Sequence, residues 1–232
     1  MKHLLGLSQD HLTSLESQQL IHKDAQLAYK QLKDAAKKEG LELNFTSSFR
    51  SFEAQKNIWN KKARGEKDLL DDLGNCIDYN CLNKEEVLFS IMRWSALPGM
   101  SRHHWGTDID VYDEASLPFS EYQIEHTPYE VSKKGPFGKL HTWLSKEIKN
   151  NNSFGFFRPY QNDLGGVSPE MWHLSYYPVS RKYLDEVSFE FFQENLESKI
   201  YQDLELLDLV KENKQKIYEQ YIINISKPTW LD

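Results

Sequence analysis

Apolar and polar positions in the first part of the chain predict a helix, a strand and a second helix. Apolar residues recur at helical spacing within residues 21–38, and Gly40 follows as a stop signal. Residues 41–47 alternate apolar and polar side chains, as a half-buried strand does, and residues 52–64 return to helical character. Arg50 is therefore expected in the turn that leads from the strand into the second helix.

The rest of the chain continues this mixture of helices and short strands. Residues 65–83 are rich in Asp, Asn and Gly, which predicts an irregular excursion. The pattern after it predicts helices at residues 84–95 and 137–149, and strands at residues 107–112, 154–157 and 172–177. The sum is an α+β fold with a small central, mainly antiparallel sheet and flanking helices.

The C-terminal region changes to two charged, amphipathic helical segments, at residues 181–196 and 201–223. We predict a main domain at residues 1–178 and a helical C-terminal extension at residues 179–232 that packs on it. The side chains expected to face the core are Leu204, Leu207, Val210 and Ile217. A helix that binds a partner is the alternative interpretation of this region.

Length and charge narrow the class of protein. A chain of 232 residues suits one compact domain with a substantial core. Its formal net charge of -7 gives no overall basic field, so nucleic acid is not expected as a partner. The basic cluster of Lys61, Lys62 and Arg64 is interpreted as a solvated helix face.

The sequence shows neither a membrane span nor an export signal. No stretch approaches the about 20 apolar residues that cross a bilayer. The apolar start of the chain gives way to Ser8 and Asp10 before a signal-peptide core could form, which favours a cytoplasmic location. Cys76 and Cys81 are too few for a disulfide framework and are interpreted as two thiols, with a local disulfide as the alternative.

The segment from Pro98 to Asp110 concentrates two imidazoles and two carboxylates around one predicted loop-to-strand junction. Zinc accepts imidazole nitrogen and carboxylate oxygen as ligands, so the segment is a candidate metal site, with a hydrogen-bonded loop as the alternative. The two carboxylates share a face of the predicted strand, because side chains on a strand repeat with period two. The residues concerned are His103, His104, Asp108 and Asp110.

A second cluster, at residues 168–176, completes the chemistry of a catalytic zinc site. Such a site commonly uses three protein ligands and keeps a fourth position for a water molecule, whose proton a nearby carboxylate accepts. His173 offers the third ligand and Glu170 offers the base.

Three motifs, in this order along the chain, resemble a known family. The motifs are Ser47-Ser48-Phe49-Arg50-Ser51 with Gln55 after it, Ser101-x-His103-x-x-Gly106-x-x-x-Asp110, and Glu170-x-Trp172-His173. Together they resemble the bacterial zinc D-alanyl-D-alanine carboxypeptidases and the D,D-peptidases of vancomycin resistance, which are LAS-type metallopeptidases. The resemblance covers about residues 45–178 and implies the fold that these peptidases share with hedgehog proteins.

The resemblance implies a role for each matched residue. The implied ligands of a Zn²⁺ cofactor are His103, Asp110 and His173. Glu170 is implied to be the catalytic base, and Arg50 to face the scissile carbonyl and stabilise the oxyanion. The residues implied to lie near the substrate are Ser101 and Gln55.

The chain departs from the family pattern at three places. Ser48 replaces a glycine, Asp108 replaces a small apolar residue, and Leu174-Ser175 replaces aromatic and basic residues. We interpret Asp108 as a partner that orients a ligand histidine, with attraction of a cationic substrate group as the alternative.

The implied activity is hydrolysis of a peptide bond next to a D-amino acid in peptidoglycan stem peptides or their precursors, as a D-alanyl-D-alanine carboxypeptidase. An endopeptidase that cuts the L-Ala-D-Glu bond and a non-catalytic module that binds cell-wall peptides are the alternatives. Because cross-linked peptidoglycan lies outside the cytoplasmic membrane, action in the periplasm or cell envelope is an alternative to the cytoplasmic location. The sequence leaves the oligomeric state open.

Overall fold

A four-stranded antiparallel sheet lies at the centre of the computed structural model, which describes residues 1–15 and 18–231. Every neighbouring pair of strands in this sheet is antiparallel, which confirms the predicted α+β fold. In spatial order the strands are β3 (Leu43–Ser47), β6 (Asp108–Asp113), β8 (His173–Tyr176) and β7 (Phe156–Phe157).

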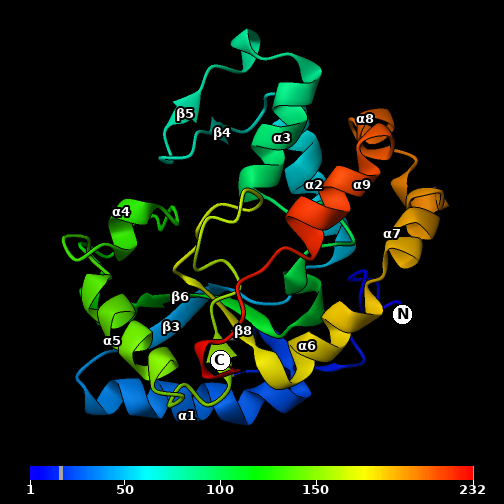
Figure 1. Ribbon diagram of the computed structural model, residues 1–232. Coiled ribbons are helices and arrows are strands. Elements are labelled where there is room, and N and C mark those ends of the chain that lie inside the picture. The colour runs from blue at the N-terminus through cyan, green and yellow to red at the C-terminus, as the bar shows by residue number, and fades with distance from the viewer. Residues whose placement is uncertain (16–17, 232) are drawn as a thin grey trace.

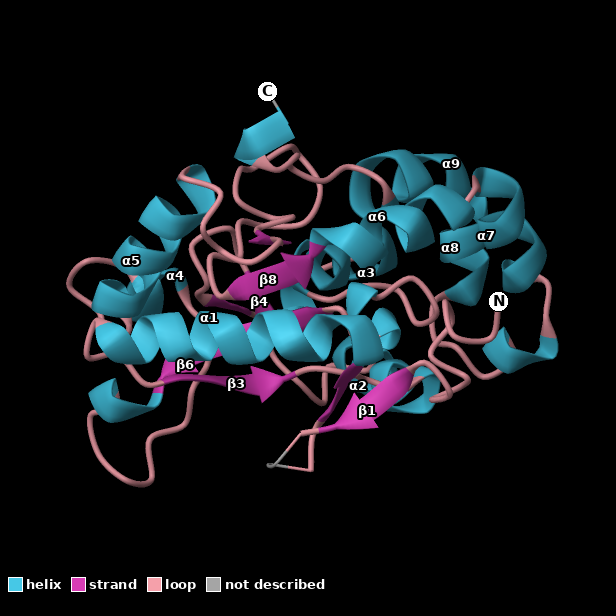
Figure 2. Cartoon of the chain, turned by 90° about the horizontal axis from the view of Figure 1, so that it is seen from below, coloured by secondary structure: helices cyan, strands magenta, loops and turns pink. Residues whose placement is uncertain are grey.

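Two hydrophobic clusters hold the sheet and the helices together. One face of the sheet packs on α1 (Gln26–Lys38), which lies in front of the sheet in Figure 2, and on α5 (Gly138–Lys149). The second cluster joins α2 (Phe52–Ala63) and α3 (Lys84–Trp94) to the C-terminal helices, on the side of the sheet away from α1 (Figure 1).

Side-chain alternation along β6 divides its residues between a core and a polar face. Ile109 and Val111 are buried in the cluster formed with α1 and α5. Asp108 and Asp110 must then emerge on the opposite face, because successive residues of a strand point to opposite sides. The strand that builds the core thus also positions two carboxylates.

The C-terminal region packs on α2 and α3, but its helices differ from the predicted pair. Ser188 ends the first predicted helix, because its side chain accepts a hydrogen bond from the backbone N–H of Phe191 (3.1 Å) and so begins a new helix. Leu206 adopts a left-handed conformation (φ 63°) that interrupts the second. The helices observed are α6 (Tyr177–Glu186), α7 (Phe189–Leu196), α8 (Leu207–Glu212) and α9 (Lys214–Ile217).

Three of the four C-terminal side chains expected to face the core are buried, and the fourth is partly buried against the same cluster. The buried side chains are Leu204, Val210 and Ile217, and the partly buried one is Leu207. The division of the chain at residue 178 stays a prediction.

Short hairpins lie outside the central sheet. The first predicted helix was extended too far toward the N-terminus: Ile21 pairs with Thr13 in a hairpin, and α1 begins only at Gln26. A second hairpin lies in the predicted irregular excursion, where Cys76 and Cys81 are exposed free thiols.

Among the described residues, no helix has the length and apolar content to cross a membrane. The remaining elements are β1 (Leu12–Ser14), β2 (Leu20–His22), β4 (Leu69–Leu70), β5 (Cys76–Ile77) and α4 (Pro128–Val131).

Candidate metal centre and active site

Two neighbouring strands bring Asp110 and His173 face to face. These residues are partners in the antiparallel pairing of β6 with β8, so both side chains emerge on the polar face of the sheet. Oδ1 of Asp110 lies 3.3 Å from Nδ1 of His173. The 3₁₀ turn Arg102–Trp105 supplies His103, whose Nε2 lies 3.2 Å from Oδ2 of Asp110. One ligand atom from each of these three residues lies within 4.8 Å of the others.

Hydrogen bonds on the outer side of each imidazole determine which ring nitrogen faces this cluster. Nδ1 of His103 lies 2.8 Å from the carbonyl oxygen of Ser48, and Nε2 of His173 lies 2.9 Å from Oδ1 of Asp108. Because carbonyl and carboxylate oxygens accept hydrogen bonds, these nitrogens donate, and in a neutral ring the lone pair is on the other nitrogen. Nε2 of His103 and Nδ1 of His173 therefore turn their lone pairs toward Asp110.

The donor set of the cluster fits a zinc ion. Oδ1 of Asp110 is buried and makes no hydrogen bond to any described residue, although buried carboxylate oxygens normally make one. Burial opposes ionisation of Asp110, but the two histidines beside it hold the pKa of its carboxyl well below the ordinary value. Burial also opposes protonation of His173, but the three carboxylates around its ring, those of Asp108, Asp110 and Glu170, raise its pKa well above the ordinary value. The cluster therefore attracts positive charge, and its two nitrogens and one carboxylate oxygen are compatible with a zinc site.

Asp108 lies behind His173, in a buried network of hydrogen bonds. Its carboxylate accepts hydrogen bonds from Nε of Arg102 (2.8 Å), Oγ1 of Thr107 (2.6 Å) and Oγ of Ser175 (3.0 Å). Asp108 is 0% exposed, so it orients the histidine, as predicted, and does not meet a cationic substrate group. Ser175 is the cross-strand partner of Asp108, so two departures from the family pattern occupy facing positions in the sheet.

Replacing Asp108 with Asn is expected to destabilise the protein by about 3–5 kcal/mol, because the buried guanidinium of Arg102 loses its carboxylate partner. The affinity for zinc should fall by about 10- to 100-fold, as is usual when the outer partner of a ligand histidine is removed. Denaturant unfolding and a zinc competition titration measure the two effects. The control Asp185→Asn breaks an exposed ion pair with Arg181 and should change neither. Wild-type stability and affinity in Asp108→Asn would contradict this role.

Glu170 reaches the cluster from the loop that precedes β8. Its Oε2 lies 3.4 Å from Nδ1 of His173, and its side chain is 13% exposed. Its backbone N–H donates to the carbonyl oxygen of Tyr160 (2.8 Å), and its own carbonyl oxygen accepts from the N–H of His173 (3.1 Å). Burial raises the pKa of Tyr160 to about 12, so its hydroxyl stays protonated at neutral pH. This leaves Glu170 as the carboxylate that lies beside the cluster and can exchange a proton with a bound group.

Arg50 is held at the start of α2 by two side chains. Its Nη1 donates to Oε1 of Gln55 (2.8 Å), and its Nη2 donates to Oγ of Ser47 (3.0 Å). Its backbone N–H donates to the carbonyl oxygen of His103 (3.1 Å), which joins the arginine to the turn of the metal cluster. Gln55 is 0% exposed, and its Nε2 donates to the carbonyl oxygen of Ala96 (2.7 Å). The structure thus places Gln55 behind Arg50, which it orients, and its contact with a substrate stays a prediction.

His104 and Ser101 lie close together in the chain but in different surroundings. Nε2 of His104 accepts a hydrogen bond from the N–H of Gly99 (2.9 Å), and its Nδ1 donates to the carbonyl oxygen of Arg50 (2.6 Å). Burial lowers the pKa of His104 to about 3, so this ring stays neutral and fixes the loop. Ser101 is 2% exposed and directly precedes the turn, and its contact with a substrate stays a prediction.

Lys62 and His126 are notable positions that sequence patterns did not reveal. Lys62 is 6% exposed, so its interpretation as part of a solvated helix face is wrong, and its Nζ donates to Oγ of Ser95 (2.8 Å). A signal existed, because Lys62 follows Gln55 by two helical turns and so shares its buried face of α2. His126 packs on Trp172 with ring centroids 5.6 Å apart, a long-range contact that no local pattern specifies.

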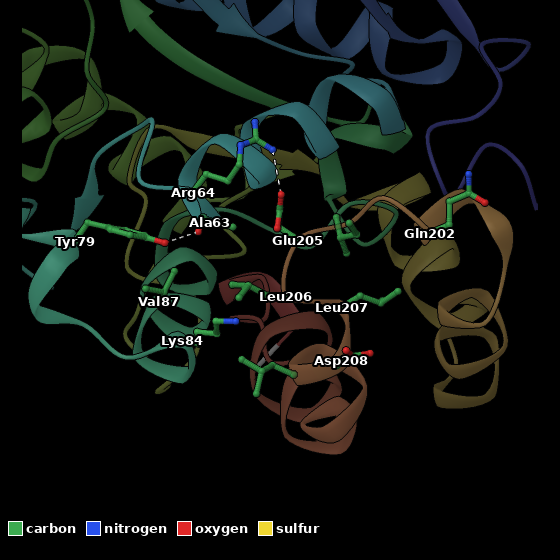
Figure 3. Close-up of a pocket in the computed structure, with 12 residues that line it drawn as sticks. Ala63, Arg64, Tyr79, Lys84, Val87, Gln202, Glu205, Leu206, Leu207 and Asp208 are labelled. Carbon is green, nitrogen blue, oxygen red and sulfur yellow. Dashed lines mark hydrogen bonds and ion pairs between the residues drawn. The ribbon is translucent and has the colours of Figure 1, made fainter.

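A pocket of about 610 Å³ lies at the end of α2 that is far from Arg50 (Figure 3). Arg64 and Glu205 form an ion pair there (3.3 Å), and the hydroxyl of Tyr79 donates to the carbonyl oxygen of Ala63 (2.7 Å). The residues that line this pocket include none of those that the sequence motifs single out. The chemistry of the sequence motifs therefore belongs to the metal cluster and not to this pocket.

The family comparison matches most of the chain. The sequence model of the VanY family, described as D-alanyl-D-alanine carboxypeptidase, matches residues 18–179. A protein of Haemophilus influenzae, described as uncharacterized, is 40% identical over 98 residues, which are 40% of this chain and 67% of that protein.

Two solved structures share the fold. The structure of VanYB in complex with D-alanine-D-alanine has a TM-score of 0.51 and 24% identity, and the match covers 81% of this chain and 89% of that one. The structure of a mutant of the vancomycin-resistance D,D-pentapeptidase VanY, in complex with Zn(II), has a TM-score of 0.50 and 22% identity. This match covers 78% of this chain and 88% of that one. These likenesses confirm the predicted LAS-type fold. Since the family model matches well over half of its residues, the chain belongs to the VanY family of D-alanyl-D-alanine carboxypeptidases.

Proposed function

We propose that this protein is a zinc-dependent peptidase that hydrolyses a peptide bond next to a D-amino acid in peptidoglycan stem peptides, as a D-alanyl-D-alanine carboxypeptidase. The observation that carries the proposal is the convergence of His103, Asp110 and His173, with Glu170 beside them. Membership of the VanY family supports it, and so does the likeness to relatives that bind Zn(II) and D-alanine-D-alanine.

Each residue of the site has a part in this chemistry. When bound, the zinc ion supplies a Lewis acid for the scissile carbonyl and lowers the pKa of a coordinated water toward neutrality. Glu170 accepts the proton of the attacking water and passes it to the departing amine. Arg50 faces the scissile carbonyl and balances the negative charge that develops on its oxygen, with Gln55 holding the guanidinium in place. Ser101 contributes to substrate binding beside the turn that carries His103.

The reaction products test the proposal. A disaccharide pentapeptide that ends in D-Ala-D-Ala contains both the D-Ala-D-Ala bond and the L-Ala-D-Glu bond. We expect mass spectrometry to show the loss of one terminal alanine after incubation with the zinc-loaded protein. Cleavage at L-Ala-D-Glu, which removes most of the stem peptide, would instead identify an endopeptidase. Binding of an intact muropeptide without cleavage would identify a non-catalytic module.

A further inference from the structure

Lys62 is a buried amine with few partners. The residue is 6% exposed, and within the described part of the chain its Nζ makes one hydrogen bond, to Oγ of Ser95 (2.8 Å). A lysine ammonium has three N–H donors, so two of them have no protein acceptor. A buried charge with a single neutral partner is unfavourable for folding, which indicates that the group is retained for another purpose.

The partner of Lys62 belongs to a segment that borders the active site. Ser95 directly follows Trp94, whose indole ring stacks on that of Trp172 with centroids 6.4 Å apart. Trp172 in turn lies two residues after Glu170, in the loop that leads into β8. The amine is therefore bound to the segment whose Trp94 packs on the loop that carries the proposed base.

Gln55 connects the same segment to Arg50. Its side-chain amide donates to the carbonyl oxygen of Ala96 and accepts from the guanidinium of Arg50 (2.7 and 2.8 Å). Gln55 and Lys62 share the buried face of α2, and both contact the partly buried segment 94–96. Lys62 and Arg50 are thus two cations linked to one segment, Lys62 directly and Arg50 through Gln55.

The charges around Lys62 agree with this placement. Burial lowers its pKa most, Lys67 and Arg50 lower it further, and Glu170 raises it, with a resulting pKa of about 8. The amine is therefore mostly protonated at neutral pH. The positive charges of Lys62, Lys67 and Arg50 therefore act in the neighbourhood of Glu170, which favours an anionic group there.

We propose that Lys62 binds the free carboxylate of the C-terminal residue of the substrate, an assignment that rests on the proposed carboxypeptidase function. In this proposal Arg50 interacts with the oxygen of the scissile carbonyl. The terminal carboxylate lies one residue beyond that carbonyl, so a second cation is needed to bind it. A substrate with an amide or a further residue at this position offers the ammonium no negative charge and is disfavoured, because a buried charge without a counter-charge is costly. Lys62 thereby selects a chain end over an internal peptide bond.

Lys62→Met tests this role, because methionine fills a similar volume without the charge. The substrates are two peptides that both end in D-Ala-D-Ala, one with a free carboxylate and the other with a terminal carboxamide. We expect the wild type to prefer the free acid in kcat/KM, and the variant to lose about 10- to 100-fold of this preference, mainly through KM, as for one hydrogen bond between charged groups. The control Lys61→Met alters an exposed neighbour on α2 and should keep the wild-type preference.

Thermal unfolding separates this role from a structural one. Lys62→Met should have a Tm equal to or above that of the wild type, because a poorly paired buried charge is removed. A lysine that only stabilised the fold would give a lower Tm and an unchanged preference for the free acid. An unchanged preference in a folded Lys62→Met variant overturns the assignment while the carboxypeptidase function stands. If the wild-type enzyme cleaves neither peptide, the proposed function fails, and the assignment of Lys62 fails with it.

Discussion

Replacing Glu170 with Gln is expected to lower kcat by about 10²- to 10⁴-fold, the usual contribution of a positioned acid–base group. Glutamine keeps the size of the side chain and the backbone contacts of this position but cannot accept the proton of water. Glu170 lies beside the cluster of proposed ligands and is not one of its three members, so the zinc content should stay at the wild-type level. Kinetics on a peptide that ends in D-Ala-D-Ala, together with elemental analysis, measure both quantities.

Glu121→Gln is the matched control for this experiment, because Glu121 is exposed. It should keep the wild-type kcat and the wild-type zinc content. If Glu170→Gln hydrolysed the peptide at the wild-type rate, another group would have to move the proton. If the variant lost its zinc, Glu170 would instead belong among the ligands.

Replacing His103 with Ala is expected to remove zinc from the protein and, with it, peptidase activity. The substitution deletes one of three proposed protein ligands, the nitrogen that lies 3.2 Å from Oδ2 of Asp110. The purified variant should therefore contain substoichiometric zinc, whereas Glu170→Gln should retain it. Elemental analysis after dialysis against zinc-free buffer makes the measurement.

His126→Ala controls for the general loss of an imidazole near the site. His126 packs on Trp172 and donates no ligand to the cluster, so this variant should keep its zinc. Stoichiometric zinc in His103→Ala would exclude His103 as a required ligand.

Local patterns in the sequence were sufficient for much of the sheet and for the chemistry that it carries. Alternation along β6 separates Ile109 and Val111, which enter the core, from Asp108 and Asp110, which face the site. The same rule on β8 places Leu174 in the core and its two neighbours on the opposite face. The candidate ligands could be identified from their motifs, and their approach to one another follows from strand pairing.

The strand register, the helix breaks and the buried position of Lys62 depend on long-range contacts that no local pattern specifies. The pairing that sets Asp110 opposite His173 joins distant parts of the chain, and register is not encoded within either strand alone. The breaks at Ser188 and Leu206 occur inside segments whose apolar spacing is continuous. The basic cluster around Lys62 predicts a solvated helix face, whereas its spacing from Gln55 fits a buried one, and the packing against Ser95 decides between the two.

A crystal structure of the zinc-loaded protein, with anomalous scattering measured at the zinc edge, tests the proposed metal centre most directly. We expect one anomalous peak with Nε2 of His103, Nδ1 of His173 and a carboxylate oxygen of Asp110 each at about 2.0–2.2 Å from it. Asp108 should keep its hydrogen bond to Nε2 of His173, and Glu170 should lie beside the metal without coordinating it. A peak bounded by other residues, or no peak in protein that holds stoichiometric zinc, would contradict the proposed site.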